Sequence, residues 1–599
     1  MEAVTSPKNE VKGGSFIIKE TKSQDVFIPE LFSEEQKMIR ETLQDFVEKQ
    51  VYPHVHDIEK QKDGVVPGLL EQLGELGMLG ADMPEGYGGM ELDTITNSLI
   101  TETLGPSGSF SVAYSAHVGI GMLPILYYGT EEQKEKYLPG LISGQLKASY
   151  CLTEPGSGSD ALSARTSAVL SEDGKYYRLN GQKMWITNSG FADVFIVFAK
   201  IDGNEFTCFI VEKGSDGLSL GAEEDKMGIK GSSTRQVFFE NVAVPCNNVL
   251  GEVGKGHHIA FNVLNIGRLK LGLGTMGGAK SCITTSVKYA NERVQFGQPI
   301  SNFGAIQHKL AEQAIQTFAL ESALYRTAGM IEDRRKVAEE EGKGFGTSKL
   351  IAAEEFAIEC AMLKVAGSEV LDYVVDEMVQ IHGGMGYSEE GVAARAYRDA
   401  RINRIFEGTN EINRLLTVDM LLKRAMKGHI DIVGPAWAVQ KELAAMPSLE
   451  QVEGEFGLEQ KAIKDFKKII LMVAGGAAKK QMDGVLDLRN EQEIIMLVAD
   501  MMIETFLAES FLLRATRLKE NKMDQWSEEL HQMLKVYVHQ TNQNIQNYAS
   551  NAIAAFTEGD LQRTFLMGLK RYSKYPVINV VACRRNIAKK LIEANQYCY

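Results

Sequence analysis

One carboxylate is the best candidate in the sequence for acid–base chemistry. Glu407 follows the apolar Ile405 and Phe406 and precedes Gly408. A carboxylate held against apolar groups has a raised pKa and can act as a general base near neutral pH. Taken alone, the pattern fits an ordinary surface glutamate better. The hypothesis of a base therefore needs support from other segments.

Two further segments carry groups suited to a planar ligand that bears phosphates. Tyr150–Ala164 (YCLTEPGSGSDALSA) combines glycines with several hydroxyls, so its backbone can approach a ligand closely. Met184–Gly190 (MWITNSG) places an indole two residues from a hydroxyl, at Trp185 and Thr187. Such a pair suits a ring with polar edges. A plain surface turn and a core tryptophan are the alternatives.

A third segment interrupts a helical pattern with glycines. Gln380–Glu411 contains Gly383, Gly384 and Gly386, which weaken a helix unless a ligand or close packing compensates. Arginines then recur at three-residue steps, at positions 395, 398, 401 and 404.

Two weaker patterns favour structural explanations. Gly272, Gly274 and Gly277 form a GxGxxG, but no convincing strand precedes them, so close helix packing explains them better than a dinucleotide site. The His54, His56 and Asp57 group has no further ligand cluster, and a solvated helix face is the better interpretation. We therefore predict no metal site.

The spacing of prolines divides the chain into segments that must position these groups. No proline lies between Pro155 and Pro245, where four runs are rich in β-branched and aromatic residues. These expected strands are Tyr176–Thr187, Asp193–Lys200, Glu205–Glu212 and Thr234–Val244. No proline lies between Pro299 and Pro435, where apolar residues recur at helical spacing. The predicted order is an α domain, an antiparallel β module, a helical bundle and a further α module, an α+β fold that is mainly α.

Composition excludes several classes of protein. The 599 residues are enough for roughly four domains, and hydrophobic and charged residues are 44% and 24% of the chain. The net charge of −15 makes nucleic acid an unsuitable partner. The run Ile469–Ala478 is too short to span a bilayer. Seven irregularly spaced cysteines and an N-terminus without an apolar core lead us to expect a cytoplasmic protein with reduced thiols.

Together, these segments resemble the acyl-CoA dehydrogenase flavoenzymes over roughly residues 35–425. Cys151–Ser163 fits the first signature of that family, and Gln380–Asp399 fits the second. Trp185-Ile186-Thr187, Arg293–Gly297 (RVQFG) and Glu407-Gly408-Thr409 stand at the expected places. The resemblance replaces the surface-glutamate and core-tryptophan interpretations.

The resemblance implies a fold and a division into domains. We expect an N-terminal tail (1–34), an N-terminal α domain (35–149), a middle β-barrel (150–255) and a four-helix bundle (256–425). A linker (426–457) and a C-terminal helical extension (458–599) follow. FAD is expected between the barrel and the bundle.

The resemblance also assigns roles residue by residue. Glu407 matches the base that removes the α-proton of an acyl-CoA thioester while the β-hydrogen leaves as hydride to flavin N5. Some members place the base before the CoA-contacting arginine, but Gly267 precedes Arg268 here. The residues expected to contact FAD are Tyr150, Cys151, Leu152, Thr153, Gly158, Ser159, Trp185, Ile186, Thr187, Arg293, Gln295, Phe296, Gln380, Gly383, Gly384, Thr409, Asn410 and Glu411. Those expected to contact substrate are Ser159, Asn265, Arg268 and Gly408.

The extension most resembles the very-long-chain subgroup and its bacterial relatives. In that subgroup, dimers replace tetramers and some members touch membranes. Gln380, Gly383 and Gly384 match contacts made by a neighbouring subunit, so at least a dimer is implied. The helix expected at Lys467–Lys480 either lies at a membrane surface or packs on the bundle; packing is favoured.

Small residues predict the substrate. The segment Phe110–Met122 carries Ser111, Ala113, Ser115, Ala116, Gly119 and Gly121. If it lines the acyl pocket, as in the family, it leaves room for a long chain. The expected reaction is dehydrogenation of long-chain fatty acyl-CoA to trans-2-enoyl-CoA, with an electron-transfer flavoprotein as acceptor. An acyl-CoA oxidase that uses dioxygen, or a scaffolding protein that keeps the fold, are the alternatives.

Overall fold

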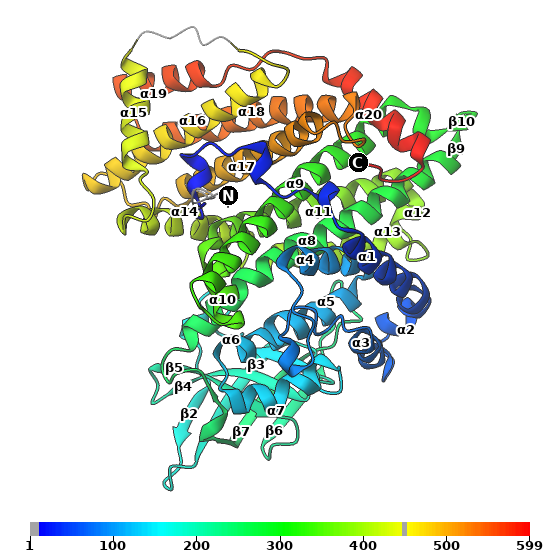
Figure 1. Cartoon of the computed structure of the whole chain (residues 1–599), viewed down its shortest axis with the longest axis vertical. Coiled ribbons are helices and arrows are strands. Elements are labelled where there is room, and N and C mark those ends of the chain that lie inside the picture. The colour runs from blue at the N-terminus through cyan, green and yellow to red at the C-terminus, as the bar shows by residue number, and fades with distance from the viewer. Residues whose placement is uncertain (1–10, 446–451) are drawn as a thin grey trace, which may run out of the picture.

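The computed structural model describes residues 11–445 and 452–599. A β domain lies at one end of the molecule, and helices form the rest (Figure 1). The C-terminal helices cover the side of the long bundle helices that is remote from the β domain. The mainly helical α+β fold predicted from the sequence is confirmed.

The N-terminal domain is a set of short helices. Two of them begin with a capping box, Ser33 with Gln36 and Thr130 with Gln133, which satisfies the free N–H groups of the first turn. A π-helical turn, Ala116–Gly121, interrupts the longest apolar stretch. The helices are α1 Glu34–Phe46, α2 Val55–Glu59, α3 Val65–Glu75, α4 Thr94–Leu104, α5 Ser109–Ser115, α6 Leu123–Tyr128 and α7 Glu131–Ile142.

One described segment, Ser109–Tyr128, is long and apolar enough to cross a membrane by length and composition. However, 78% of its apolar window is buried inside the protein. The π-turn packs on β1 (Ala148–Cys151), and His117 anchors it there by accepting a hydrogen bond from the Ala148 N–H. The segment therefore belongs to the core of the domain.

The middle domain is a sheet of eight strands that includes the four predicted ones. Most pairings are antiparallel, but β4 runs parallel to both β1 and β2. The predicted strands do pair antiparallel, β3 with β7 and β4 with β5, and the parallel pairs involve two strands that the sequence did not predict. β1 and β2 lie one after the other along the same edge of β4, and the loop between them leaves the sheet. The remaining strands are β2 Ser167–Leu170, β3 Tyr176–Thr187, β4 Val194–Ile201, β5 Glu205–Glu212, β6 Leu218–Glu223, β7 Thr234–Pro245 and β8 Val249–Leu250.

Four long helices form the bundle: α8 Gly256–Glu292, α9 Gly304–Glu340, α11 Ala357–His382 and α14 Asn410–Met426. A Cβ at Gly277 would collide with the carbonyl of Glu102, and one at Gly272 would stand 2.9 Å from Leu324. Close packing thus explains two glycines of the GxGxxG, as predicted. The bundle also carries α10 Phe345–Glu355, α12 Gly384–Tyr387, α13 Val392–Ala400 and the hairpin of β9 Val294–Gln295 with β10 Gln298–Pro299.

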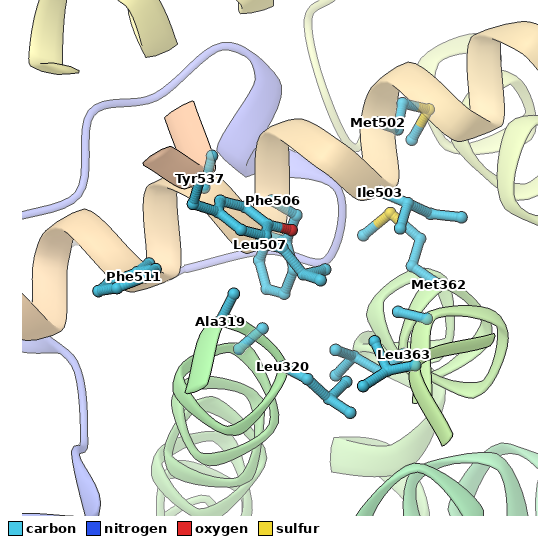
Figure 2. Packing of buried hydrophobic residues seen from close by; sticks show 14 of the residues in the cluster. Ala319, Leu320, Met362, Leu363, Met502, Ile503, Phe506, Leu507, Phe511 and Tyr537 are labelled. Carbon is cyan, nitrogen blue, oxygen red and sulfur yellow. The ribbon is translucent and has the colours of Figure 1, made fainter. Parts of the chain in front are cut away.

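The C-terminal helices share an apolar core with the bundle. Side chains of α17, among them Phe506 and Phe511, pack against α9 and α11 (Figure 2). Each fully buried side chain of this size contributes roughly 1.5–3 kcal/mol. The extension is therefore an integral layer of the protein. Its helices are α15 Val433–Ala444, α16 Gly457–Met482, α17 Gln492–Glu520, α18 Glu528–Phe556, α19 Gly559–Tyr572 and α20 Val580–Ala594.

Two expectations about the connecting segments need correction. Residues 11–34 of the expected tail are packed, because Phe16 and Ile28 are buried and the Phe16 ring contacts that of Phe506. The expected linker contains α15; its residues 446–451 and the tail residues 1–10 lie outside the described residues. The apolar face of α16 is buried in the shared core, which agrees with the favoured interpretation that this helix packs on the bundle.

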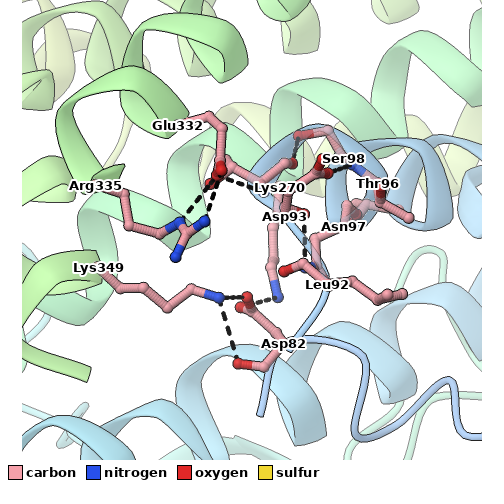
Figure 3. A network of polar contacts seen from close by, with 12 residues as sticks. Asp82, Leu92, Asp93, Thr96, Asn97, Ser98, Lys270, Glu332, Arg335 and Lys349 are labelled. Atoms are coloured by element: carbon pink, nitrogen blue, oxygen red, sulfur yellow. Dashed lines mark hydrogen bonds and ion pairs between the residues drawn. The ribbon is translucent and has the colours of Figure 1, made fainter. Parts of the chain in front are cut away.

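A buried polar network joins the N-terminal domain to the bundle (Figure 3). Asp82 forms an ion pair with Lys349, and Lys270 Nζ lies 3.9 Å from Asp82 Oδ2. Glu332 accepts hydrogen bonds from the Thr94 N–H and from Arg335. Although burial opposes it, these donors lower the pKa of Glu332 to about 2.

Candidate functional site

Glu407 lies on a short turn between α13 and α14 whose backbone is left-handed. Its φ is +58°, and Gly408 follows at +81°. A non-glycine residue in this region is strained and persists only where its surroundings hold it. The turn is held through its carbonyls: Asn413 donates to three of them, those of Glu407, Gly408 and Thr409.

The Glu407 carboxylate is buried and available for chemistry. Its Oε2 has no hydrogen-bond partner within the described part of the chain. Burial raises the pKa of Glu407, and the nearby cations of Arg268 and Lys364 oppose the rise. An unpaired carboxylate with a raised pKa is suited to accept a proton from a bound ligand.

Glu407 lines a cavity of about 650 Å³, which runs along α8. The α8 residues in its wall extend from Gly267, beside Glu407, to Thr285, which is about 27 Å of helix. Four of the six small residues singled out above line it, Ser111, Ser115, Ala116 and Gly119. Ala113 and Gly121 are buried instead against other parts of the domain. The wall is mostly apolar but also carries Glu59, Lys270, Arg395 and Asp399, so the cavity suits a long ligand that is largely apolar.

Gly274, the third glycine of the GxGxxG, also faces this cavity. A Cβ built there would have no neighbour within 4 Å. In this GxGxxG, Gly272 and Gly277 allow close helix packing, whereas Gly274 widens the cavity.

The loop expected at the flavin lies between β1 and β2. Gly158 and Ser159 are exposed, whereas the side chains of Tyr150 and Cys151 are buried in apolar cores, so only their backbone can reach a ligand. Leu152 and Thr153 are half-buried and bonded through their carbonyls to β3.

A buried ion pair supports this loop from below. Lys183 Nζ lies 2.7 Å from Glu154, and Glu154 also accepts from the Arg165 and Thr166 N–H groups. Neither residue is among the site residues predicted from the sequence. Glu154 could have been found as the glutamate of the first signature, and Lys183 as a lysine among uncharged residues of the expected strand.

A β-bulge turns Trp185 out of the sheet. The register between β3 and β7 shifts between Lys183 and Ile186, and Trp185 has a φ of +60°. Its indole is 52% exposed, while the side chain of the next residue, Ile186, is buried. Thr187 lines the cavity that holds Glu407. Bulges commonly re-aim a side chain at functional sites, and a core tryptophan is thereby excluded.

The start of α14 adds backbone donors to this region. Thr409 caps the helix and accepts from the Ile412 N–H, while Glu411 is exposed. The Asn410 side chain instead points into the bundle, where it bonds Lys364 and Ser368.

The other expected flavin contacts lie elsewhere in the chain. Arg293, Gln295 and Phe296 occupy the exposed β9–β10 hairpin, and Phe296 is 93% exposed. Gln380, Gly383 and Gly384 are also exposed, and Tyr289 at the base of the hairpin bonds the carbonyl of His382. These two groups share one end of the bundle, away from the β domain (Figure 1). A single chain therefore does not gather all the predicted residues at one place.

The two residues expected on the CoA side are buried beside the base. Arg268 donates to the Glu407 carbonyl and to Asn265 Oδ1. Both side chains thus support the turn in this structure, and their contact with CoA stays a prediction.

Lys364 and Asn413 are the main residues that the sequence reasoning missed. Lys364 donates to the carbonyl of Gly408 and to Asn410. The available signal was a lysine inside the apolar run CAMLKVAG, where a buried charge needs a partner.

Comparisons with known proteins agree with this arrangement. Family models match residues 33–145 (acyl-CoA dehydrogenase, N-terminal domain), 149–242 (middle domain), and 254–422 and 465–571 (both C-terminal domain). A probable acyl-CoA dehydrogenase of Bacillus subtilis is 47% identical over 98% of both chains. The rat very long-chain specific enzyme is 44% identical over 60% of this chain and 53% of its own length. A crystal structure of an acyl-CoA dehydrogenase complexed with FAD, from Bacillus anthracis, superposes with a TM-score of 0.94 at 47% identity, over 98% of this chain and 100% of that one.

Proposed function

Because the chain belongs to the acyl-CoA dehydrogenase family, we propose that it oxidises long-chain fatty acyl-CoA thioesters to trans-2-enoyl-CoA, with Glu407 as the base. The observation that carries the proposal is Glu407 Oε2, which accepts no hydrogen bond from the described residues, in the wall of a long cavity that small residues line in part.

The family uses FAD, and the residues present fit it. Trp185 offers an exposed indole face, and no side chain fills the space beside Gly156 and Gly158. A Cβ at either position would meet nothing within 4 Å, so the loop can approach a ligand. The loop, Trp185–Thr187 and Thr409–Glu411 would hold the flavin, which supplies the acceptor for the hydride.

The remaining chemistry belongs to the chain itself. Glu407 Oε2 accepts the α-proton, and the turn holds the carboxylate toward the cavity. The Arg268 and Lys364 cations stabilise the carboxylate form before the proton arrives. The apolar cavity wall orients the chain and excludes water, which strengthens these charge interactions.

The exposed hairpin and the Gln380–Gly384 segment support a homodimer, in which a second copy brings these residues to the flavin. The proposal also includes an electron-transfer flavoprotein as acceptor and a cytoplasmic location. The seven cysteines, all free, are compatible with a reducing compartment.

Anaerobic mixing with palmitoyl-CoA tests the function. We expect the flavin absorbance of the holoprotein to bleach, to stay bleached when air is admitted, and not to bleach in Glu407→Gln. Rapid recovery in air with peroxide formation would indicate an oxidase. No bleaching at any chain length would favour a scaffolding role.

A further inference from the structure

A fully buried lysine contacts the turn that carries the base. Lys364 projects from α11, and its Nζ lies 2.7 Å from the Gly408 carbonyl and 2.8 Å from Asn410 Oδ1. Burial of an ammonium group is costly unless it is paired and hydrogen-bonded. Both contacts are to the turn that carries Glu407. The free-energy cost of burying the ammonium group is therefore offset only while that turn keeps its position.

Three side chains donate hydrogen bonds to the backbone carbonyls of the turn. Arg268 from α8 donates to the Glu407 carbonyl, Lys364 from α11 donates to that of Gly408, and Asn413 from α14 donates to both. In a trans peptide, the N–H points opposite to the carbonyl. Fixing these carbonyls therefore directs the N–H groups of Gly408 and Thr409 away from the donors, and neither finds an acceptor in the described residues.

A second layer fixes Lys364 and its partner. Asn410 donates to Ser368 and Glu369 of α11, and Arg414 pairs with both Glu369 and Asp500 of α17. Burial lowers the pKa of Lys364 to about 7; the carboxylates of Glu407, Glu369 and Glu411 oppose the fall, and the charge of Arg268 adds to it. On the acidic side of that value, where the base is titrated, Lys364 carries its charge. The ammonium thus lies between the base and a network that reaches the C-terminal extension.

We propose that Lys364 is a positioning residue for proton abstraction: it holds the Glu407–Asn410 turn so that the carboxylate faces the cavity, and its charge favours the ionised base. The inference rests on the proposed function, because it concerns the same proton transfer. A purely structural lysine would stabilise the bundle without setting the ionisation of Glu407.

Three variants of the FAD-loaded protein separate these roles. Lys364→Met removes the bonds and the charge, whereas Lys364→Gln retains a donor without charge. Lys349→Met is the matched control, since Lys349 is also a buried lysine of the bundle, but it pairs with Asp82 and lies outside the Glu407 cavity.

The first readout is the limiting rate of flavin reduction by palmitoyl-CoA as a function of pH. We expect Lys364→Met to lower the rate by about 100-fold, the usual cost of a displaced catalytic group. On the acidic side of the pH profile (the acidic limb), the fall in rate should begin about one pH unit higher. The reason is that Glu407 loses one of the two neighbouring cations that lower its pKa. Lys364→Gln should recover part of the rate but keep the shifted limb. Lys349→Met should keep the wild-type limb.

The second readout is hydrogen exchange of the backbone amides in residues 405–411 of the resting holoprotein. Exchange should be faster in Lys364→Met than in either the wild type or Lys349→Met. An unshifted acidic limb, or equal exchange in all proteins, would overturn the role of Lys364 while leaving the proposed function intact. A wild type that no acyl-CoA reduces would overturn both.

Discussion

The carboxylate of Glu407 lies directly against the α-carbon of Gly267. A Cβ built at position 267 would stand 2.8 Å from Glu407 Oε2 and 3.2 Å from Cδ. Two positions far apart in sequence, one on α8 and one on the turn before α14, therefore face the same space. The resemblance to the family gives these two positions as the alternative sites for the base, and the structure places both at the same space.

This relationship predicts that the base can be moved. Glu407→Gly should slow flavin reduction by about 10²- to 10⁴-fold, the usual contribution of a general base. Adding Gly267→Glu should restore about tenfold or more, because the collision at position 267 is with the carboxylate that has been removed. Stopped-flow reduction by palmitoyl-CoA measures both. If Gly267→Glu restores nothing in the Glu407→Gly background, the two positions are not equivalent.

The environment of Glu407 predicts the pH dependence of the reaction. Burial raises the pKa of its carboxyl, so at low pH the base is protonated and inactive. The rate of reduction should therefore fall as the pH falls through a value above 4.5, the ordinary value for glutamate. A pH series of single-turnover rates measures this limb. A rate that stays constant down to pH 4.5 would show that no raised carboxyl controls the reaction.

The cavity wall predicts how chain length can be changed. A Cβ at Gly119 would meet only Lys270 Cδ, at 3.9 Å, so a larger side chain there projects into the cavity with little strain. Gly119→Leu should lower kcat/KM for palmitoyl-CoA by about tenfold or more. The same variant assayed with butyryl-CoA is the control and should be little affected. An equal loss for both substrates would indicate a general distortion.

Because the bulge exposes Trp185, we predict that this residue contributes more to FAD binding than to the free energy of unfolding. Because its indole is 52% exposed, Trp185→Ala should change the stability of the cofactor-free protein by no more than about 0.5 kcal/mol. The purified variant should nevertheless retain less FAD, as measured by the ratio of flavin to protein absorbance. Full FAD content would show that the indole does not contact the flavin.

The network in Figure 3 predicts a dependence of stability on pH. The pKa of Glu332 is lowered from 4.5 to about 2, so its stabilisation is fully present above pH 4.5 and is lost as the pH falls toward 2. Glu332→Gln should cost up to about 3 kcal/mol at pH 7. The Tm difference from the wild type should shrink below pH 4.5. Glu339→Gln, which removes a more exposed partner of the same Arg335, is the control and should cost much less.

Much of this fold could be read from local patterns. Composition, together with the turn residues between the segments, placed Tyr176–Thr187 and Glu205–Glu212 at the observed bounds of β3 and β5. The glycines at 272 and 277 were assigned correctly to close packing, because a missing Cβ at helical spacing has a local meaning. The segment signatures similarly pointed to Glu407, Trp185 and the loop after β1 as candidate site residues, because residue types and spacing within a short segment define such signatures.

The sequence by itself therefore determined the family and the order of domains, and it supplied Glu407 as the candidate for the base. Only the tertiary structure decided that Glu407 Oε2 has no hydrogen-bond partner among the described residues, that Lys364 and Asn413 hold its turn, and that residues 11–34 pack between the bundle and the extension. The physical reason is that local backbone preference and periodicity are encoded within a few residues. Burial, hydrogen-bond partners and pKa shifts instead depend on groups that folding brings together from distant parts of the chain.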